Sequence, residues 1–113
     1  MTSTLHVAVL GAGNWGTTLA QLVASNGHRV QLWTRDAAQA DEINQHHRSP
    51  HTQPGLALAP GVRAALDLGE VLDHADLVLV VVPSQAFRSV CRALGERVRP
   101  DHVVVHGTKG LEA

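Results

Sequence analysis

Six residues near the start of the chain, Gly11 to Gly16, have the types and the spacing to hold a phosphate group. They read Gly-Ala-Gly-Asn-Trp-Gly, which is the pattern G-x-G-x-x-G. In this pattern the first glycine allows a tight turn, the second lets a pyrophosphate approach the backbone, and the third lets a helix pack closely on a strand. A helix that begins at such a turn offers free N–H groups and the positive end of its dipole to an anion. Gly11, Gly13 and Gly16 therefore predict a phosphate-binding turn.

The surroundings of this motif strengthen the prediction, because three spaced glycines alone are weak evidence. Leu5 to Leu10 is a short apolar run that predicts a buried strand, and Asn14 to Asn26 carries apolar residues at helical spacing. A strand, a glycine turn and a helix at the first βα connection are typical of dinucleotide binding. The alternative is a structural turn in some other doubly wound domain. A P-loop is excluded, because the pattern G-x-x-x-x-G-K-S/T is absent from the sequence.

The residues after the second predicted strand bear on the choice of dinucleotide. An acidic residue at the end of that strand, Arg29 to Trp33, would favour NAD by binding the ribose 2′-hydroxyl. Thr34 stands there instead, and Arg35 follows it. A guanidinium can pair with a 2′-phosphate and stack on adenine, so we expect NADP in preference to NAD. The alternative for Arg35 is a solvated surface side chain, and Asp36 is predicted to cap the next helix rather than to bind ribose.

The rest of the chain alternates strands and helices. Strands are predicted at Leu5–Leu10, Arg29–Trp33, Val62–Ala65, Leu77–Val82 and His102–Val105, and helices at Asn14–Asn26, Ala37–His46, Asp67–His74 and Gln85–Val98. Such alternation predicts an α/β fold with a doubly wound parallel sheet of the Rossmann type and right-handed crossovers. We expect a single domain over residues 1–113, with strand order 3-2-1-4-5 and the first strand central. The run at 77–82 is apolar without alternation, as in a strand covered on both faces.

Side-chain patterns complete the expected secondary structure. The first helix is predicted to bury a stripe formed by Trp15, Leu19, Leu22 and Val23, and the last a stripe formed by Phe87, Val90, Cys91 and Leu94. Ile43 is the apolar anchor expected in the second helix. Asp67 and Ser84 are expected N-caps, and Gly27 an expected left-handed C-cap. The proline-rich segment His47–Pro60 predicts a loop of a length that is usually functional.

Composition excludes several classes of function. The formal net charge is −1, so the chain has no basic footprint for nucleic acid and no polybasic membrane signal. The longest apolar run, Leu77 to Pro83, is too short to span a bilayer, and Met1 to Thr4 lacks the features of a signal peptide, so we expect no stable membrane insertion. The single cysteine permits no intrachain disulfide, and we expect a cytoplasmic protein.

Metal-dependent and hydrolytic chemistry are also disfavoured. His46, His47 and His51 lack the i, i+4 pair of a helical zinc site and have no cysteine nearby, so we expect no metal. Ser84 is not part of a G-x-S-x-G turn, which argues against a hydrolase. Asp73 and Asp76 flank a turn and do not form a convincing catalytic pair.

Five motifs in order resemble the N-terminal half of bacterial NAD(P)-dependent glycerol-3-phosphate dehydrogenases. The resemblance covers nearly the whole chain and rests on Gly11–Ala20, Trp33–Arg35, the Ile43-Asn44, His47 and Pro54-Gly55 pattern, Val82–Gln85 and Thr108–Glu112. The chain departs from the family pattern before Pro54, where Ser49, Thr52 and Gln53 replace the usual Asn and Tyr-Leu. Thr18 also replaces a usual alanine.

The resemblance implies that Asn14, Trp15, Arg35 and Lys109 contact the cofactor, and that Lys109 also faces the phosphate or hydroxyl of a small substrate. It implies interconversion of glycerol 3-phosphate and dihydroxyacetone phosphate by hydride transfer, a step toward glycerophospholipid precursors. The family places its general-base lysine in a helical C-terminal domain. We therefore expect residues 1–113 to be a fragment of a two-domain enzyme that binds cofactor and does not turn over. With the second domain missing, an apolar patch should be exposed near the C-terminus and favour self-association as a homodimer.

Two other functions stay open at this point. One is a related β-hydroxyacid or ketopantoate-type reductase, against which the Lys109-Gly110 turn argues. The other is a non-catalytic dinucleotide-sensing module, in which the Pro54-Gly55 segment and the Lys109 motif would have no role.

Overall fold

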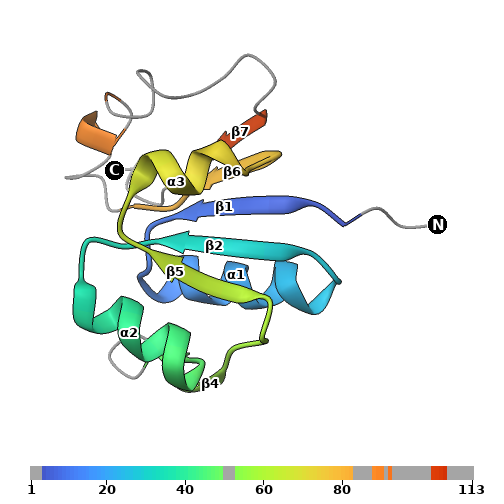
Figure 1. Ribbon diagram of the computed structural model, residues 1–113, viewed down its shortest axis with the longest axis vertical. Helices are drawn as coiled ribbons and strands as arrows, with labels where there is room; N and C mark the ends of the chain where they lie inside the picture. Colours follow the sequence, from blue (N-terminus) through green and yellow to red (C-terminus); the bar gives the residue numbers. More distant parts are fainter. Residues whose placement is uncertain (1–3, 50–52, 83–87, 91, 93–102, 107–113) are drawn as a thin grey trace.

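The computed structural model describes residues 4–49, 53–82, 88–90, 92 and 103–106. Within them a parallel sheet of five strands has the order β5-β2-β1-β6-β7 (Figure 1). The strands are β1 (His6–Leu10), β2 (Arg29–Trp33), β5 (Val62–Ala65), β6 (Leu77–Val80) and β7 (Val103–His106). Because β5, β6 and β7 are the third, fourth and fifth predicted strands, the doubly wound sheet and its order are confirmed.

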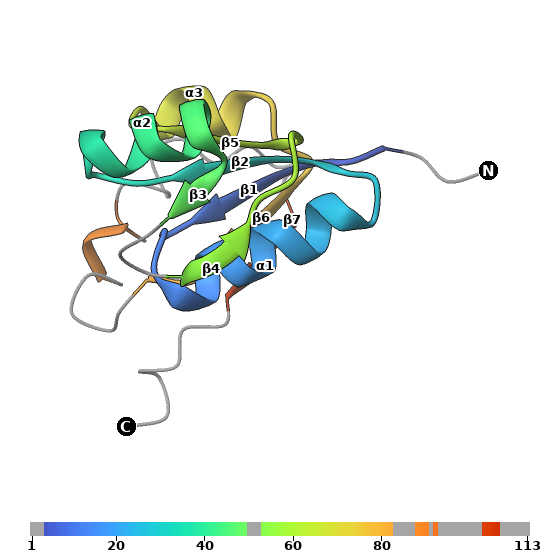
Figure 2. The same cartoon turned by 90° about the horizontal axis from the view of Figure 1, so that it is seen from below.

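Helices cover both faces of this sheet. Helix α1 (Asn14–Ser25) and helix α2 (Ala37–His46) pack on one face, and helix α3 (Leu68–Asp73) packs on the other. Figure 2 shows α1 and α3 on opposite sides of the strands. This arrangement places the first βα connection, which runs from β1 into α1, at the carboxyl edge of the sheet.

The central strand β1 is buried on both faces, as a parallel strand between two helical layers must be. Val7 and Val9 join the apolar cluster under α1 and α2, whereas Ala8 and Leu10 join the cluster under α3. Each of these four side chains is at most 2% exposed. The strand before the glycine motif is therefore held rigidly by packing from both sides.

The strand predicted at 77–82 ends earlier in the structure, because β6 stops at Val80. Val78 and Val80 are buried in the cluster under α3, while Leu77 and Leu79 are half-buried and pack against the opposite cluster. Apolar groups thus cover both faces, which accounts for the unbroken apolar run.

The predicted buried stripe of α1 is wrong in part. Trp15 is 60% exposed and Leu22 is 56% exposed, whereas Thr17 and Ala20 are fully buried. A Cβ atom on Gly16 would overlap the Gly11 carbonyl oxygen, so α1 lies too close to the turn to place a large side chain between them. Close packing therefore selects the face with small side chains, and the larger apolar groups face outward.

The segment predicted as a loop contains a two-stranded antiparallel ribbon. Its strands are β3 (Arg48–Ser49) and β4 (Gln53–Ala57), and β4 includes Pro54 and Gly55. Proline has no N–H group to donate, but an edge strand tolerates it at positions that need no hydrogen bond to a neighbouring strand. The prolines therefore did not exclude a strand here, and the prediction of a loop was wrong for these residues. The Leu58 N–H donates to the His47 carbonyl oxygen (2.8 Å), and Leu58 is 5% exposed.

The capping residues at three helix ends were predicted correctly. The Asp36 carboxylate accepts from the N–H groups of Ala38 and Gln39, and that of Asp67 accepts from Gly69 N–H. Gly27 has φ +92° just after α1. Ile43 in α2 and Val90 in the last predicted helix are fully buried, as expected. The predictions for Ser84, Phe87, Cys91 and Leu94 lie outside the described residues.

Candidate functional site

The turn at Gly11 admits no side chain. Gly11 has φ +120°, a left-handed conformation that L-residues rarely adopt, and a Cβ atom there would lie 2.6 Å from the Val81 carbonyl oxygen. The chain leaves β1 at Leu10 and reverses within this turn to enter α1. Gly11 thus has the turn-forming role that the motif predicts, at the edge of the sheet where ligands of open α/β folds bind.

Thr17 ties the first turn of α1 back to the glycine turn. Its hydroxyl donates to the Gly13 carbonyl oxygen at 2.7 Å and lies 3.3 Å from that of Ala12. The Thr17 N–H donates to the same Gly13 oxygen (2.9 Å), and the side chain is fully buried. Together with the close approach of Gly16, these contacts hold the helix and the turn in one geometry.

The start of α1 is open to an anion. Gly13 is the N-cap residue, and no side chain of the described residues caps the helix there. The first N–H groups of any α-helix lack acceptors within the helix, so those of α1 are available to a ligand. A Cβ atom on Gly13 would find no heavy atom of the described residues within 4 Å. This end of α1 can therefore receive a phosphate, as at other glycine-rich turns.

Asn14 and Trp15 form the first residues of α1. The Asn14 side chain lies outside the described part of the chain, so only its backbone is placed at the turn. Trp15 lies on the exposed side of the helix. Its indole is thus available to a ligand, although it takes no part in the core that the sequence pattern predicted for it.

A cavity of about 180 Å³ connects the glycine turn with the end of β2. It brings together groups that the sequence separates by more than twenty positions, because β1 and β2 are parallel neighbours whose carboxyl ends share one edge. Its lining residues are Gly11, Ala12, Trp33, Thr34, Arg35, Val82 and Val90. Two of the sequence-predicted site residues, Gly11 and Arg35, therefore line one cavity.

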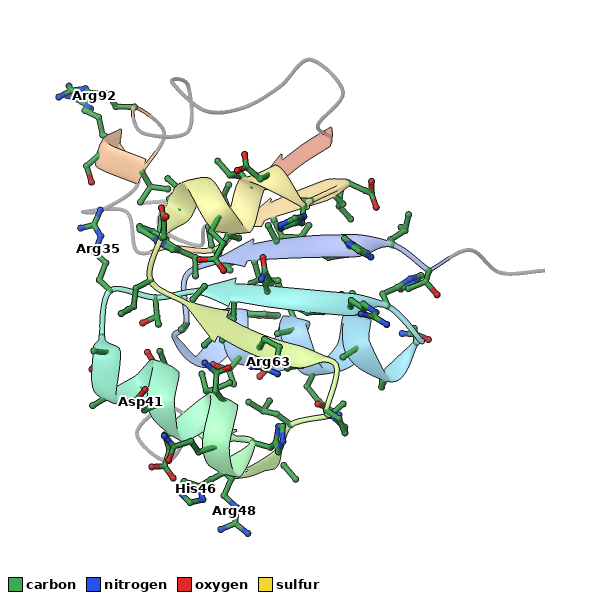
Figure 3. The ribbon with its side chains drawn as sticks, viewed as in Figure 1. Arg35, Asp41, His46, Arg48, Arg63 and Arg92 are labelled. Carbon is green, nitrogen blue, oxygen red and sulfur yellow. The ribbon has the colours of Figure 1, made fainter. Side chains whose placement is uncertain are left out.

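Arg35 is exposed and stands beside Trp33. Its guanidinium carbon lies 5.2 Å from the centroid of the Trp33 ring, a cation–π geometry, and the Trp33 indole N–H donates to the Leu66 carbonyl oxygen (3.0 Å). Figure 3 shows the Arg35 side chain extending from the carboxyl end of β2 away from α2. The arginine thus presents a positive charge at the rim of the cavity.

Thr34 occupies the strand-end position at which an acidic residue would bind ribose. It is 6% exposed, and its hydroxyl donates to Gln39 Oε1 (2.9 Å) and accepts from the Asp36 N–H (3.1 Å). Gln39 in turn donates from Nε2 to the Ala12 carbonyl oxygen (2.7 Å). The hydroxyl is thus engaged within the protein, and this position presents no carboxylate to a ribose.

Sequence reasoning missed Gln39 and Thr17 as parts of this site. The spacing Asp36-x-x-Gln39 is a capping-box pattern, which points the glutamine toward the backbone of its own helix. In the structure it reaches the glycine turn instead. No local pattern signals that contact, because its partner, Ala12, lies 27 residues earlier in the chain.

A larger cavity, about 540 Å³, lies at the opposite edge of the sheet. Its lining includes His6 and Arg29, the first residues of β1 and β2, and His74 at the end of α3. None of the sequence-predicted site residues lines it. The amino edge of a parallel sheet is not where such folds bind nucleotides, so the smaller cavity is the candidate site.

Three further expectations concern Lys109, metal binding and membrane insertion. Lys109 lies outside the described residues. In the described part of the chain, no group of three or more His, Cys, Asp or Glu side chains could hold a metal ion. None of the helices there combines the length and apolar character needed to cross a bilayer.

Comparison with known proteins gives a consistent result. The family model for the N-terminus of NAD-dependent glycerol-3-phosphate dehydrogenase matches residues 6–113. A glycerol-3-phosphate dehydrogenase [NAD(P)+] of Nitratidesulfovibrio vulgaris is 46% identical over 108 residues, which are 96% of this chain and 33% of that protein. The chain thus spans about a third of the length of such relatives.

Solved structures agree in fold. The crystal structure of glycerol-3-phosphate dehydrogenase from Coxiella burnetii matches with a TM-score of 0.88 and 31% identity, over 94% of this chain and 33% of that one. The enzyme from Saccharomyces cerevisiae matches with a TM-score of 0.86 and 27% identity, over 95% and 34%. Both likenesses extend over nearly all of the present chain.

Proposed function

The chain belongs to the family of NAD-dependent glycerol-3-phosphate dehydrogenases, in its N-terminal part, and from this premise we propose that it is the cofactor-binding part of an enzyme that interconverts glycerol 3-phosphate and dihydroxyacetone phosphate. The observation that carries the proposal is the uncapped start of α1, which comes directly after Gly11 and Ala12, the two residues of the glycine turn that line one cavity with Arg35. The family match favours this activity over the β-hydroxyacid or ketopantoate-type reductase and over the sensing module.

The family implies a nicotinamide dinucleotide, and the residues of the site fit one. The pyrophosphate would accept hydrogen bonds from N–H groups in the first turn of α1, where Gly13 leaves room. The absence of acidic residues from that turn avoids repulsion of the phosphates. When bound, the nicotinamide supplies or accepts the hydride, and the protein's part is to hold and orient it.

NADP is the preferred cofactor in this proposal. Arg35 offers a guanidinium at the rim of the cavity, and a guanidinium pairs well with a 2′-phosphate. The neighbouring Thr34 hydroxyl is already bonded to Gln39 and Asp36, and a threonine has no carboxylate that would repel a phosphate. The contact with Trp33 already restricts the Arg35 side chain in the free protein, so less conformational entropy is lost when the guanidinium binds a phosphate.

Roles at three further residues rest on the family resemblance. Asn14 and Trp15 would contact the cofactor from the first turn of α1, consistent with the exposure of Trp15. Lys109 follows β7 in the sequence, and β7 runs parallel to its neighbour β6. The carboxyl ends of such strands form the ligand-binding edge, where an ammonium would suit a small phosphate substrate.

The present chain is proposed to bind cofactor without turning over, because it spans about a third of the length of its relatives and the resemblance places the general-base lysine in a C-terminal domain. Residues 1–113 then form one domain of a two-domain enzyme. A cytoplasmic location fits the single cysteine. Self-association as a homodimer stays a prediction, because the C-terminal residues near which the apolar patch is expected lie outside the described residues.

Calorimetric titration with NADPH and NADH tests this proposal on the chain itself. We expect binding of both and tighter binding of NADPH. An assay with dihydroxyacetone phosphate should show no steady NADPH oxidation. Failure to bind either dinucleotide would refute the cofactor site, tighter binding of NADH would refute the NADP preference, and robust turnover would refute the requirement for a second domain.

A further inference from the structure

We propose that Gln39 is a positioning residue that orients the glycine turn for the pyrophosphate and couples that turn to the ribose-binding end of β2. The inference rests on the proposed function. It starts from two contacts of one side chain: Nε2 donates to the Ala12 carbonyl oxygen at 2.7 Å, and Oε1 accepts from the Thr34 hydroxyl at 2.9 Å. Ala12 and Thr34 are both lining residues of the 180 Å³ cavity.

The direction of every hydrogen bond in this chain of contacts is determined. The Ala12 carbonyl oxygen can only accept, so the NH₂ group of Gln39 must face it. The Gln39 oxygen therefore faces Thr34 and receives the hydroxyl proton, while the Asp36 N–H donates to a lone pair of the same hydroxyl. A primary amide supplies the acceptor and the donor that the two partners require, and a carboxylate or an apolar side chain does not.

The contact with Ala12 determines where the next N–H points. In a trans peptide the C=O and N–H groups point in opposite directions, and the described chain contains no cis peptide bonds. Because Gln39 and the Thr17 hydroxyl hold the Ala12 oxygen between α2 and α1, the N–H of Gly13 is turned to the opposite side. Gly13 is the residue at which the backbone is open to a ligand.

Helix capping does not account for the Gln39 side chain. The Asp36 carboxylate already accepts from the N–H groups of Ala38 and Gln39 at the start of α2. The Asp36 N–H, which a capping-box glutamine would bind, donates to the Thr34 hydroxyl, and the glutamine amide joins α2 to the turn after β1. We infer that it sets the separation between the pyrophosphate and ribose subsites, which must match the length of the dinucleotide.

The test uses the whole chain with Gln39→Glu and Gln39→Leu, and Gln45→Leu as the matched control, because Gln45 is exposed on the same helix. The ligands are NADPH, which contains the pyrophosphate, and adenosine 2′-monophosphate, which does not. We expect Gln39→Glu to weaken NADPH binding about tenfold or more, because its carboxylate faces the Ala12 oxygen, and to change binding of the monophosphate less than about threefold. Gln45→Leu should alter neither.

A second measurement does not depend on any ligand. In the free chain, the amide ¹H–¹⁵N resonance of Gly13 should shift in both Gln39 variants and stay in place in Gln45→Leu. Equal loss of both ligands together with lowered thermal stability would indicate a merely structural role and overturn the inference. An unmoved Gly13 resonance would also overturn it. If the wild-type chain binds no dinucleotide but the Gly13 resonance still shifts in the Gln39 variants, the proposed function alone is refuted.

Discussion

Gly16 packs so closely on Gly11 that a methyl group at position 16 would overlap the Gly11 carbonyl oxygen. Gly13, between them, has open space where its side chain would be. The three glycines of one motif thus serve separable purposes: two make the close approach of α1 to the turn after β1 possible, and one leaves room for a ligand. Substitutions at these positions should therefore have different consequences for stability and binding.

Gly16→Ala should destabilise the chain. Alanine favours helix over glycine by up to about 1 kcal/mol, so propensity alone predicts a gain. The added methyl group would overlap backbone that cannot move aside cheaply, and overpacking of this kind costs roughly 1–3 kcal/mol, so the net change should be a loss. Urea unfolding measures it, with the exposed Leu22→Ala on the same helix as the control. A more stable Gly16→Ala variant would contradict the close approach.

Gly13→Val should remove dinucleotide binding and spare the fold. Gly13 has φ −78°, which valine adopts readily, and a Cβ atom there would meet no described heavy atom within 4 Å. The side chain would fill the space into which a phosphate must come. We expect an unfolding midpoint close to that of the wild type and a loss of NADPH affinity of about a hundredfold, from the excluded phosphate contacts. Retained affinity in a folded variant would place the pyrophosphate elsewhere.

Arg35→Ala should reduce the preference for NADPH. Hydrogen bonds to charged groups contribute about 1.5–3 kcal/mol, so NADPH affinity should fall about tenfold or more, while NADH affinity changes little because NADH lacks the 2′-phosphate. Arg48→Ala is the matched control, because Arg48 is exposed on β3 and distant from Arg35 (Figure 3). Titration calorimetry distinguishes the outcomes. A proportional loss of both cofactors would mean that Arg35 contacts a group they share.

The features that sequence analysis predicted correctly depend on short-range physics. A carboxylate one residue before a helix caps it wherever the helix lies, which is why Asp36 and Asp67 behave as expected. The glycine turn is similar in part, since the positive φ of Gly11 is a local property that glycine tolerates. Strand order also followed, because alternating strands and helices leave few topologies with right-handed crossovers.

The features that were missed depend on contacts between distant segments. Apolar spacing alone could not show that α1 presents Thr17 and Ala20 to the sheet, because that choice follows from how closely the helix approaches. The contact of Gln39 with Ala12 joins residues 27 positions apart. Prolines and a glycine indicated a loop where β3 and β4 pair. These residue types restrict the local backbone conformation but do not indicate which segments pair with one another.

Trp15→Ala should lower cofactor affinity without a cost in stability, which is the reverse of what a core residue does. The Trp15 side chain is 60% exposed, so its removal leaves no cavity, and surface changes usually alter the free energy of unfolding by less than about 0.5 kcal/mol. Ile43→Ala is the contrasting variant: Ile43 is fully buried in α2, and its truncation should cost roughly 2–5 kcal/mol. Urea unfolding and NADPH titration of both variants separate the two roles. If Trp15→Ala cost as much stability as Ile43→Ala, then α1 would bury its large side chains after all, and the open start of that helix would have to be reconsidered with it.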